Sequence, residues 1–303
     1  MNHENVFVSV IIPTYNDLIR LKDCIKALGQ QSFPRNQYEI IVVDNNSTDG
    51  TSLWLSQQAS IIFAHEAKQT SYAARNAGIR IAKGDVLAFT DSDCIPAEDW
   101  LEKGVAHLLS IPNCGFVGGS IKLFFQDPGQ LTPVEIYEAV TALPQQDYVD
   151  EHRFAATANM FTFKSVIDKV GMFDSDLSSR GDYEWGRRVY ADGYCVFYAE
   201  DAQVLHPSRH SFKQMKHKSS RVLRGTYELR EKNEELSYYV LLKDLLIGIR
   251  PPIKRIFKLT SDSEISKIKD KLSLAYVILL LHYNKSLVTA SFIFKRILRQ
   301  RSP

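Results

Sequence analysis

The stretch Asp85–Asp93 reads DVLAFTDSD and joins a short apolar run to an acidic triplet. Val86–Phe89 is apolar at consecutive positions, which is typical of a strand buried on both faces of a sheet. Two earlier runs have the same character, Phe7–Ile12, which is stopped by Pro13, and Glu39–Val43. Such strands, separated by helices, predict an α/β fold with a mostly parallel central sheet flanked by helices.

Helical signals lie between the predicted strands. The apolar side chains after the first strand recur with the period of one helix face: Leu18, Leu21, Ile25 and Leu28. A third strand is expected at Ser60–Ala64 and a second helix through Tyr72–Gly78. Ligands of parallel sheets collect beyond the carboxyl ends of the strands, so polar residues that follow these strands are the first site candidates.

The composition changes after His206. Residues 209–224 carry no acid and six basic side chains: Arg209, Lys213, Lys216, Lys218, Arg221 and Arg224. Two apolar helical stretches follow, Tyr238–Ile249 and Leu272–Phe294, each bordered by Lys and Arg. We therefore expect one region over residues 1–206 and a basic, apolar helical C-terminal region over residues 207–303.

The overall composition is that of an ordinary globular protein, with 45% hydrophobic and 24% charged residues among 303. A net charge of +2 gives no reason to expect nucleic acid as a partner. The four scattered cysteines favour free thiols in a reducing compartment. Met1–Asn5 lacks the basic start of a signal peptide, and no run reaches about 18 uninterrupted apolar residues. These features predict a cytoplasmic protein, or one on the cytosolic face of a membrane.

The acidic triplet is the strongest candidate for chemistry. Asp91 and Asp93 stand two residues apart on an extended segment, so both carboxylates can face one hard cation or its bound water. Mg²⁺ and Mn²⁺ suit such a site because they keep open positions for phosphate oxygens. The spacing alone also fits a turn with two solvated acids.

Asp44 ends a strand one strand–helix unit earlier. A carboxylate there can accept hydrogen bonds from a base or a ribose, or it can cap the following turn. The first strand is followed by Pro13–Asn16 and by no glycine-rich G-x-G-x-x-G loop, and no G-x-x-x-x-G-K-[ST] occurs in the chain. Dinucleotide-binding and P-loop functions therefore lose their main support.

Four segments, taken in order, resemble family 2 glycosyltransferases of the GT-A fold. They are VSVIIPTYN at 8–16, IVVDNNSTDGT at 41–51, ARNAG at 74–78 and FTDSD at 89–93. The resemblance is close over residues 6–105 and looser to about 206. It implies a GT-A domain with a nucleotide-sugar donor half, 1–105, and an acceptor half, 106–206, followed by a helical C-terminal extension.

The resemblance also implies an activity, namely inverting transfer of a sugar from a nucleoside-diphosphate sugar, expected to be a UDP-sugar, to an acceptor hydroxyl. Magnesium or manganese would assist on the diphosphate, and the setting would be polysaccharide or glycolipid biosynthesis. Pro13, Thr14, Tyr15 and Asp44 would line the nucleoside pocket, and Arg75 would approach the base or the phosphates.

Four residues are implied for the metal and ribose side. Asp91 would face the ribose and the metal shell with Ser92 beside it, and Asp93 would be the direct ligand. His206 would complete the metal shell after the last core strand. Imidazole is a less usual magnesium ligand and is compatible with manganese, while a lone histidine is also common as a structural residue.

The acceptor half departs from the family pattern. Relatives carry a Glu-Asp pair at the start of a helix, and here Gly181 stands at the glutamate position before Asp182. Asp182 would be the general base, with Glu184 as the competing candidate, because a helix N-terminus favours a negative charge. A plain helix cap is the structural alternative.

Two questions stay open from the sequence. The region 209–303 could bind a phosphate, lie on an anionic membrane, or form a helical subdomain or homodimer surface. The rival functions are a sugar-phosphate nucleotidyltransferase, for which Pro13–Asn16 is the wrong loop, and a non-catalytic nucleotide-sugar-binding scaffold, which only Gly181 supports.

Overall fold

The computed structural model describes residues 6–262 and 265–301, which divide into two compact units. Unit 1 holds the residues up to Leu123 together with Leu143–Leu177 and Gly181–Pro207. Unit 2 holds Phe124–Ala142, Ser178–Arg180 and the residues from Ser208 onwards. The region 1–206 therefore contributes two segments to unit 2. Met1–Asn5, on which the expectation about a signal peptide rests, lies outside the described residues.

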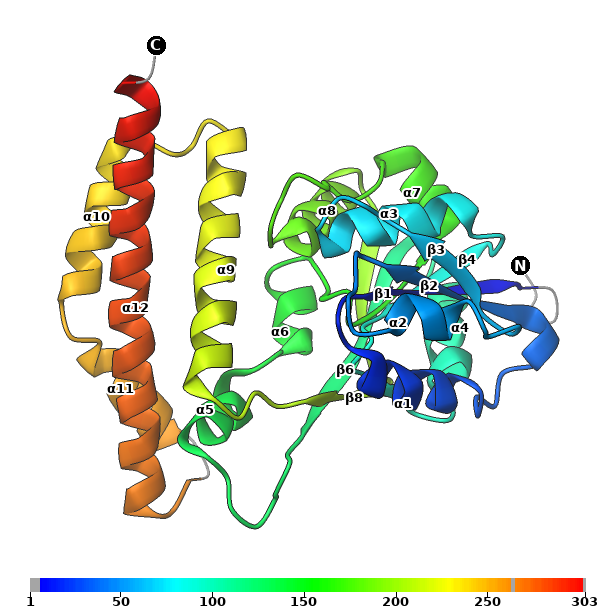
Figure 1. Ribbon diagram of the computed structural model, residues 1–303, viewed down its shortest axis with the longest axis horizontal. Coiled ribbons are helices and arrows are strands. Elements are labelled where there is room, and N and C mark those ends of the chain that lie inside the picture. The colour runs from blue at the N-terminus through cyan, green and yellow to red at the C-terminus, as the bar shows by residue number, and fades with distance from the viewer. Residues whose placement is uncertain (1–5, 263–264, 302–303) are drawn as a thin grey trace. The chain divides into compact units, whose positions relative to one another are not determined.

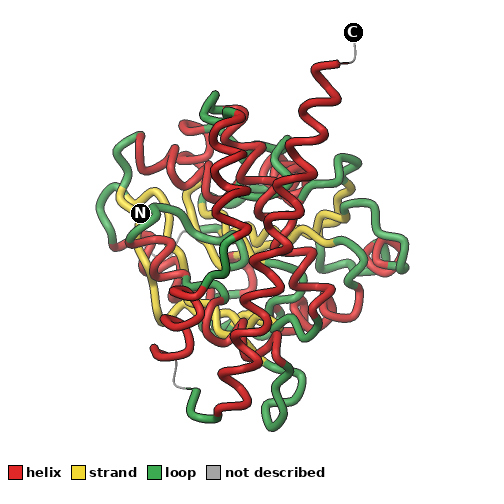
Figure 2. Tube along the Cα trace, turned by 90° about the vertical axis from the view of Figure 1, so that its left-hand side faces the viewer, coloured by secondary structure: helices red, strands yellow, loops and turns green. Residues whose placement is uncertain are grey.

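Unit 1 is built on one eight-stranded sheet in the order β3-β2-β1-β4-β7-β6-β8-β5, drawn in Figure 1 and in yellow in Figure 2. Its strands are β1 (Val8–Thr14), β2 (Tyr38–Asp44), β3 (Ile62–His65), β4 (Val86–Thr90), β5 (Ile95–Pro96), β6 (Cys114–Phe124), β7 (Asn159–Phe163) and β8 (Cys195–Pro207). The four strands predicted from the first hundred residues are all present.

The predicted parallel pairing is confirmed for half of the sheet. β1 runs parallel to β2 and β4, and β2 runs parallel to β3. Beyond β4 the strands reverse, because β7 pairs antiparallel with β4 and β6 pairs antiparallel with β7. The carboxyl ends of β1, β2 and β4 consequently meet at one edge, where Asp44 and the acidic triplet lie.

Helices cover both faces of this sheet. They are α1 (Leu18–Leu28), α2 (Thr51–Leu55), α3 (Ser71–Ile81), α4 (Trp100–Ser110), α6 (Gln145–Asp150), α7 (Lys164–Val170) and α8 (Gly181–Ala191), with one 3-10 turn at Arg35–Gln37. In β4, Val86 and Ala88 join a core with residues of α1 and α4, while Leu87 and Phe89 join a second core with α3.

The close fit of α3 on the sheet depends on a glycine. A Cβ at Gly78 would lie only 2.6 Å from Cγ2 of Ile11 in β1, so a larger residue would push α3 away. This contact sets the distance between α3 (Ser71–Ile81) and the sheet.

Unit 2 is helical. It contains α5 (Pro133–Thr141), α9 (Phe212–Lys232), α10 (Tyr238–Ile249), α11 (Ile253–Asp262) and α12 (Ile268–Arg301). The two predicted apolar helices are confirmed, with α12 longer than expected, whereas α11 was not predicted. α10 and α11 follow one another along one side of α12 (Figure 1). α12 packs on α5 and α9 through Val277 and Leu281. Leu274 and Ile278 of α12 pack on α5 and α11.

One helix among the described residues, Ile268–Leu298, is long and apolar enough to cross a membrane by length and composition alone. The sequence reading expected no such helix, because His282, Asn284 and Lys285 interrupt the apolar run. These three polar residues are too few to lower the mean hydropathy below the range of spanning helices, and 28% of the apolar window is buried inside the protein. Such a helix is weak evidence for a membrane span.

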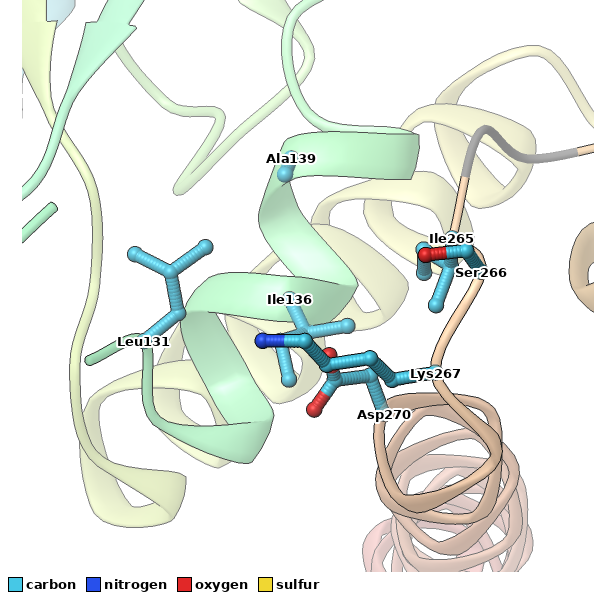
Figure 3. Close-up of a pocket in the computed structure, with 7 residues that line it drawn as sticks. All are labelled: Leu131, Ile136, Ala139, Ile265, Ser266, Lys267 and Asp270. Atoms are coloured by element: carbon cyan, nitrogen blue, oxygen red, sulfur yellow. The ribbon is translucent and has the colours of Figure 1, made fainter. Parts of the chain in front are cut away.

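A small cavity of about 200 Å³ opens between α5 and the start of α12 (Figure 3). It is lined by Leu131, Ile136, Ala139, Ile265, Ser266, Lys267 and Asp270. All of these residues belong to unit 2, whereas the sequence places every candidate catalytic residue in unit 1. This cavity is therefore not the candidate site.

A buried carboxylate ties the start of α9 to α5. The side chain of Glu138 is fully buried and accepts from Nη1 of Arg209 at 3.0 Å and Nζ of Lys218 at 3.1 Å. Burial alone would raise the pKa of Glu138, but Lys218 and Arg209 hold this pKa below its ordinary value. Two of the six basic side chains of residues 209–224, Arg209 and Lys218, thus stabilise the fold of unit 2.

We expect Glu138→Gln to lower the free energy of unfolding by about 3 kcal/mol at neutral pH, since it leaves two half-buried cations without their anion. A group with a lowered folded pKa stabilises above its unfolded pKa and loses that effect as pH falls through the folded value. The difference from wild type in urea unfolding should therefore shrink in acid. Glu235→Gln, an exposed change in the same unit, is the control, and equal effects of the two would refute the role of Glu138.

Candidate active site

The first feature at the carboxyl edge is a buried ion pair. Nη2 of Arg75, from α3, contacts Oδ1 of Asp91, which directly follows β4. The side chain of Arg75 is 4% exposed and that of Asp91 is 34% exposed. Arg75 is therefore not a surface cation, and it holds one oxygen of Asp91 while leaving the carboxylate open to solvent on its other side.

Asp93 lies against His206 at the same edge. Oδ1 of Asp93 is 3.9 Å from Nε2 of His206, which comes from β8. Together with Sγ of Cys94, these ligand atoms all lie within 4.8 Å of one another. A carboxylate and an imidazole at this separation can share one divalent ion. The donor set therefore fits the predicted metal, with Cys94 as a neighbour that was not predicted.

The orientation of His206 suits a ligand. Its Nδ1 lies 2.8 Å from the carbonyl oxygen of Pro207, and a carbonyl can only accept, so Nδ1 carries the proton. Nε2 faces Asp93 and is the nitrogen left to bind a metal, as in metal-binding histidines whose other nitrogen is held by an acceptor. Burial raises the pKa of Cys94 well above its ordinary value, and the charges of Asp91 and Asp93 add to this, so Cys94 is a neutral thiol.

Asp17, which precedes α1, and Arg20, in the first turn of α1, lie beside the acidic triplet. Nη1 of Arg20 lies 3.7 Å from Oδ2 of Asp93, and its Nε donates to Asp17 at 2.7 Å. The hydroxyl of Ser92 donates to the other oxygen of Asp17 at 3.2 Å. Burial raises the pKa of Asp17 in spite of Arg20. Arg20 is half exposed, so its guanidinium can reach a ligand beside Asp93.

Asp44 is fully buried at the end of β2. It accepts from the backbone N–H of Ser47 at 3.1 Å, and its second oxygen accepts from the hydroxyl of Ser52. Both oxygens thus organise the loop between β2 and α2. This geometry matches the turn-capping alternative, and whether Asp44 also meets a nucleoside remains a prediction.

The loops after β1 and β2 are joined to each other. The backbone N–H of Asn16 donates to the hydroxyl of Ser47 at 2.8 Å, and the side-chain carbonyl of Asn16 accepts from the N–H of Thr48 at 2.6 Å. Asn16 adopts a φ of 50°, a left-handed conformation that asparagine tolerates. These bonds hold the two loops as one rigid edge.

The predicted nucleoside-pocket residues of β1 stand on this edge. Thr14 is in register with Asp44 on the neighbouring strand, and Pro13 precedes it in the buried part of β1. The hydroxyl oxygen of Thr14 is buried with no hydrogen-bond partner among the described residues. Tyr15 is 54% exposed. The edge thus offers an aromatic surface beside buried polar groups, which suits a base and a ribose.

α3 also reaches the acceptor-side candidate. Tyr72 stands one turn before Arg75, and its hydroxyl donates to Oδ1 of Asp182 at 3.3 Å. Asp182 is the second residue of α8. Burial, with the charge of Asp182, raises the pKa of Tyr72, so its hydroxyl stays a donor. Two side chains one helical turn apart on α3 therefore contact the two carboxylates: Arg75 contacts Asp91, and Tyr72 contacts Asp182.

Tyr72 gives a steric reason for the glycine before Asp182. A Cβ at Gly181 would lie 2.8 Å from the Tyr72 ring, which is 5% exposed and packed in the core. A glutamate at position 181 would need this ring to move. The departure from the family pattern is thus matched to the aromatic side chain that contacts Asp182.

Glu184 is held differently from Asp182. Its two oxygens accept from Nε and Nη2 of Arg188 at 2.5 and 3.0 Å. Arg188 in turn donates to the carbonyl oxygens of Val170 and Met172. Glu184 therefore belongs to a bidentate pair that fastens α8 to the end of α7.

Sequence reasoning missed four residues of this site: Asp17, Arg20, Tyr72 and Cys94. A signal existed for Asp17, because it follows the first strand much as Asp44 follows the second. Tyr72 could have been found as the residue one helical turn before Arg75. Cys94 directly follows Asp93 in the sequence, so it too could have been found. Arg20 carries no such signal, since its role depends on how α1 approaches the triplet.

Comparisons with known proteins agree with this geometry. Residues 9–171 match the family model of glycosyl transferase family 2. A relative from Haloferax volcanii, "Glycosyltransferase AglE", is 36% identical over 228 residues, 74% of each chain. A dolichyl N-acetyl-α-D-glucosaminyl phosphate 3-β-D-2,3-diacetamido-2,3-dideoxy-β-D-glucuronosyltransferase from Methanococcus voltae is 25% identical over 63% of this chain and 64% of its own.

A solved structure shares the fold. The mannosyltransferase PcManGT from Pyrobaculum calidifontis, in complex with GDP-Man and Mn²⁺, aligns with a TM-score of 0.55 at 18% identity, over 94% of this chain and 73% of that one. The predicted GT-A fold and the predicted transferase class are therefore confirmed. The comparisons support neither the nucleotidyltransferase alternative nor the non-catalytic scaffold. The chain belongs to glycosyl transferase family 2.

Proposed function

We propose that this glycosyltransferase moves a sugar with inversion from a nucleoside-diphosphate sugar, with a UDP-sugar as the expected donor, to an acceptor hydroxyl. The observation that carries the proposal is the pairing of Asp93 with His206 beside the Arg75–Asp91 ion pair, all at the carboxyl edge of the sheet. This arrangement suits a diphosphate with a divalent metal on it.

The donor would lie along the rigid edge formed by the loops after β1 and β2. Tyr15 offers an exposed ring to the base, and the unpartnered hydroxyl of buried Thr14 suits a nucleoside hydrogen bond. The open oxygen of Asp91 would accept from the ribose. Arg20, half exposed beside Asp93, would meet the phosphates.

Asp93 and His206 would hold the metal, Mg²⁺ or Mn²⁺. When bound, such a cation offsets the negative charge that develops on the leaving nucleoside diphosphate. PcManGT, which shares the fold, was solved in complex with Mn²⁺, and the nitrogen ligand of this chain is compatible with manganese.

Asp182 would act on the acceptor. Its carboxylate takes the proton of the acceptor hydroxyl while that oxygen bonds to the anomeric carbon. The bond from the anomeric carbon to the diphosphate oxygen breaks, and its electron pair leaves with the nucleoside diphosphate. Tyr72 would orient Asp182, and the N-terminus of α8 favours its negative charge. Glu184 is a weaker candidate because Arg188 occupies both its oxygens.

The acceptor proposal draws on the relatives. The name of the Methanococcus voltae protein describes a sugar bound to a lipid phosphate as its acceptor. We propose a lipid-linked sugar, within glycolipid or polysaccharide biosynthesis, for this chain too, at the cytosolic face of a membrane.

Incubation with UDP-, GDP- and dTDP-sugars should release nucleotide from one donor, in a manner abolished by a chelator and restored by Mg²⁺ or Mn²⁺. Asp93→Ala should lower turnover by about two to three orders of magnitude, because the developing charge loses its main counter-ion. Asp85→Ala, an exposed acid at the opposite end of the same strand, is the matched control. The proposal would be refuted if turnover were the same with and without metal and the same for wild type and Asp93→Ala.

Asp182→Asn should lower kcat by about 10²–10⁴ and leave donor affinity by calorimetry unchanged. Tyr72→Phe should lower kcat by about tenfold through looser positioning. It should also move the acidic limb of the pH–rate profile to higher pH, because the ionised carboxylate loses a hydrogen bond.

Glu184→Gln is the comparison for Asp182→Asn. It should lower thermal stability through the loss of the Arg188 pair and retain turnover per folded molecule. The reverse pattern, full activity for Asp182→Asn and none for Glu184→Gln, would assign the base to Glu184 instead.

A further inference from the structure

α10 and α11 both expose large apolar side chains. On α10 these are Leu242, Leu246 and Ile249, spaced three to four residues apart along one side. On α11 they are Ile253, 68% exposed, and Phe257, 71% exposed. The opposite side of each helix packs inside unit 2, through Leu241 on α10 and through Ile256 on α11.

Basic side chains accompany these apolar residues. Residues 238–262, which span α10 and α11, contain five Lys or Arg (243, 250, 254, 255, 258) and two acids, Asp244 and Asp262, which gives five minus two, a net charge of +3. Asp244 is already paired with Arg230. Lys254 and Lys258 follow Ile253 and Phe257 by one position each, so they flank the apolar pair on α11. Exposed apolar side chains gathered on neighbouring helices and rimmed by polar residues are typical of a surface that meets a partner or a membrane.

We propose that the α10–α11 face, defined by Leu242, Leu246, Ile249, Ile253 and Phe257, docks in the plane of an anionic phospholipid membrane. The apolar side chains enter the boundary between headgroups and acyl chains, and the flanking lysines meet the lipid phosphates.

The structure argues against a span through α12. Val277 and Leu281 of α12 pack with α5 and α9, and Leu274 and Ile278 pack with α5 and α11. A spanning α12 would carry α9 into the bilayer with it. The cost would be prohibitive because α9 bears charged side chains along its whole length.

A second copy of the chain is a poorer occupant than a membrane. A two-fold contact through this face would bring the same basic residues of both copies together. The excess of positive charge would then meet like charge, whereas an anionic lipid surface complements it.

The test is co-sedimentation of the full-length protein with phosphatidylcholine vesicles, with and without phosphatidylglycerol. We expect binding to the anionic vesicles and weaker binding as salt is raised. The double variant Leu246→Ser/Phe257→Ser should weaken partitioning by about tenfold or more, because both side chains would enter the apolar layer. Lys254→Gln/Lys258→Gln should reduce the preference for anionic vesicles.

Two matched controls keep the result specific. Leu53→Ser removes a side chain that is 69% exposed on α2 of unit 1, close to the 63% of Leu246. Lys213→Gln/Lys216→Gln removes two exposed lysines of α9. Neither should change vesicle binding. Equal binding by wild type and the α10–α11 variants would overturn the proposal, as would a dimer in light scattering that the variants dissociate without any vesicle binding.

This inference stands apart from the catalytic proposal. Vesicle binding is measured without donor or acceptor, and the α10–α11 residues belong to unit 2 whereas the candidate active site belongs to unit 1. Failure of membrane docking would therefore leave the assignment of Asp93 and Asp182 untouched, and the reverse also holds.

Discussion

The candidate site depends on one buried ion pair, that between Arg75 and Asp91. A guanidinium with 4% of its side chain exposed must have an anion, because an unpaired buried charge costs several kcal/mol. Asp91 is that anion, and this need fixes the conformation of the turn after β4. Asp93, two residues on, is thereby presented toward His206, and Tyr72, on the same helix as Arg75, contacts Asp182. α3 links the donor side to the acceptor side.

Side-chain packing sets the distance between α3 and the sheet. Gly78 allows the helix to approach β1 closely, and the apolar side chains of β4 that face α3 are fully buried. The loops after β1 and β2 are stiffened separately, through Asn16 and Asp44. The site is therefore organised before any ligand arrives, which lowers the entropy that donor binding must overcome.

The sequence was sufficient for the parallel half of the sheet, because β1, β2 and β4 are apolar at nearly every position and end in polar turns. It could not reveal the antiparallel pairing of the other half, since β7 and β4 join residues 69 to 77 positions apart. The pairing of Arg75 with Asp91 depends on where α3 lies against β4, whereas Glu184 and Arg188 are four residues apart on one helix and could have been paired from the sequence. Tyr72 remained unseen because its contact with Asp182 spans 110 positions. A signal existed for α11, because Ile253, Ile256 and Phe257 are spaced three and four residues apart, as on one helix face, but the segment is short and follows two prolines.

The central claim is that Asp93 and His206 hold a divalent ion beside the Arg75–Asp91 pair. The most direct measurement is anomalous diffraction at the manganese edge from crystals grown with Mn²⁺ and a nucleoside diphosphate. The account predicts one anomalous peak in contact with an oxygen of Asp93 and Nε2 of His206, with the diphosphate on its open side. A diphosphate bound at this edge with no anomalous peak, or a peak whose ligands exclude Asp93, would contradict it.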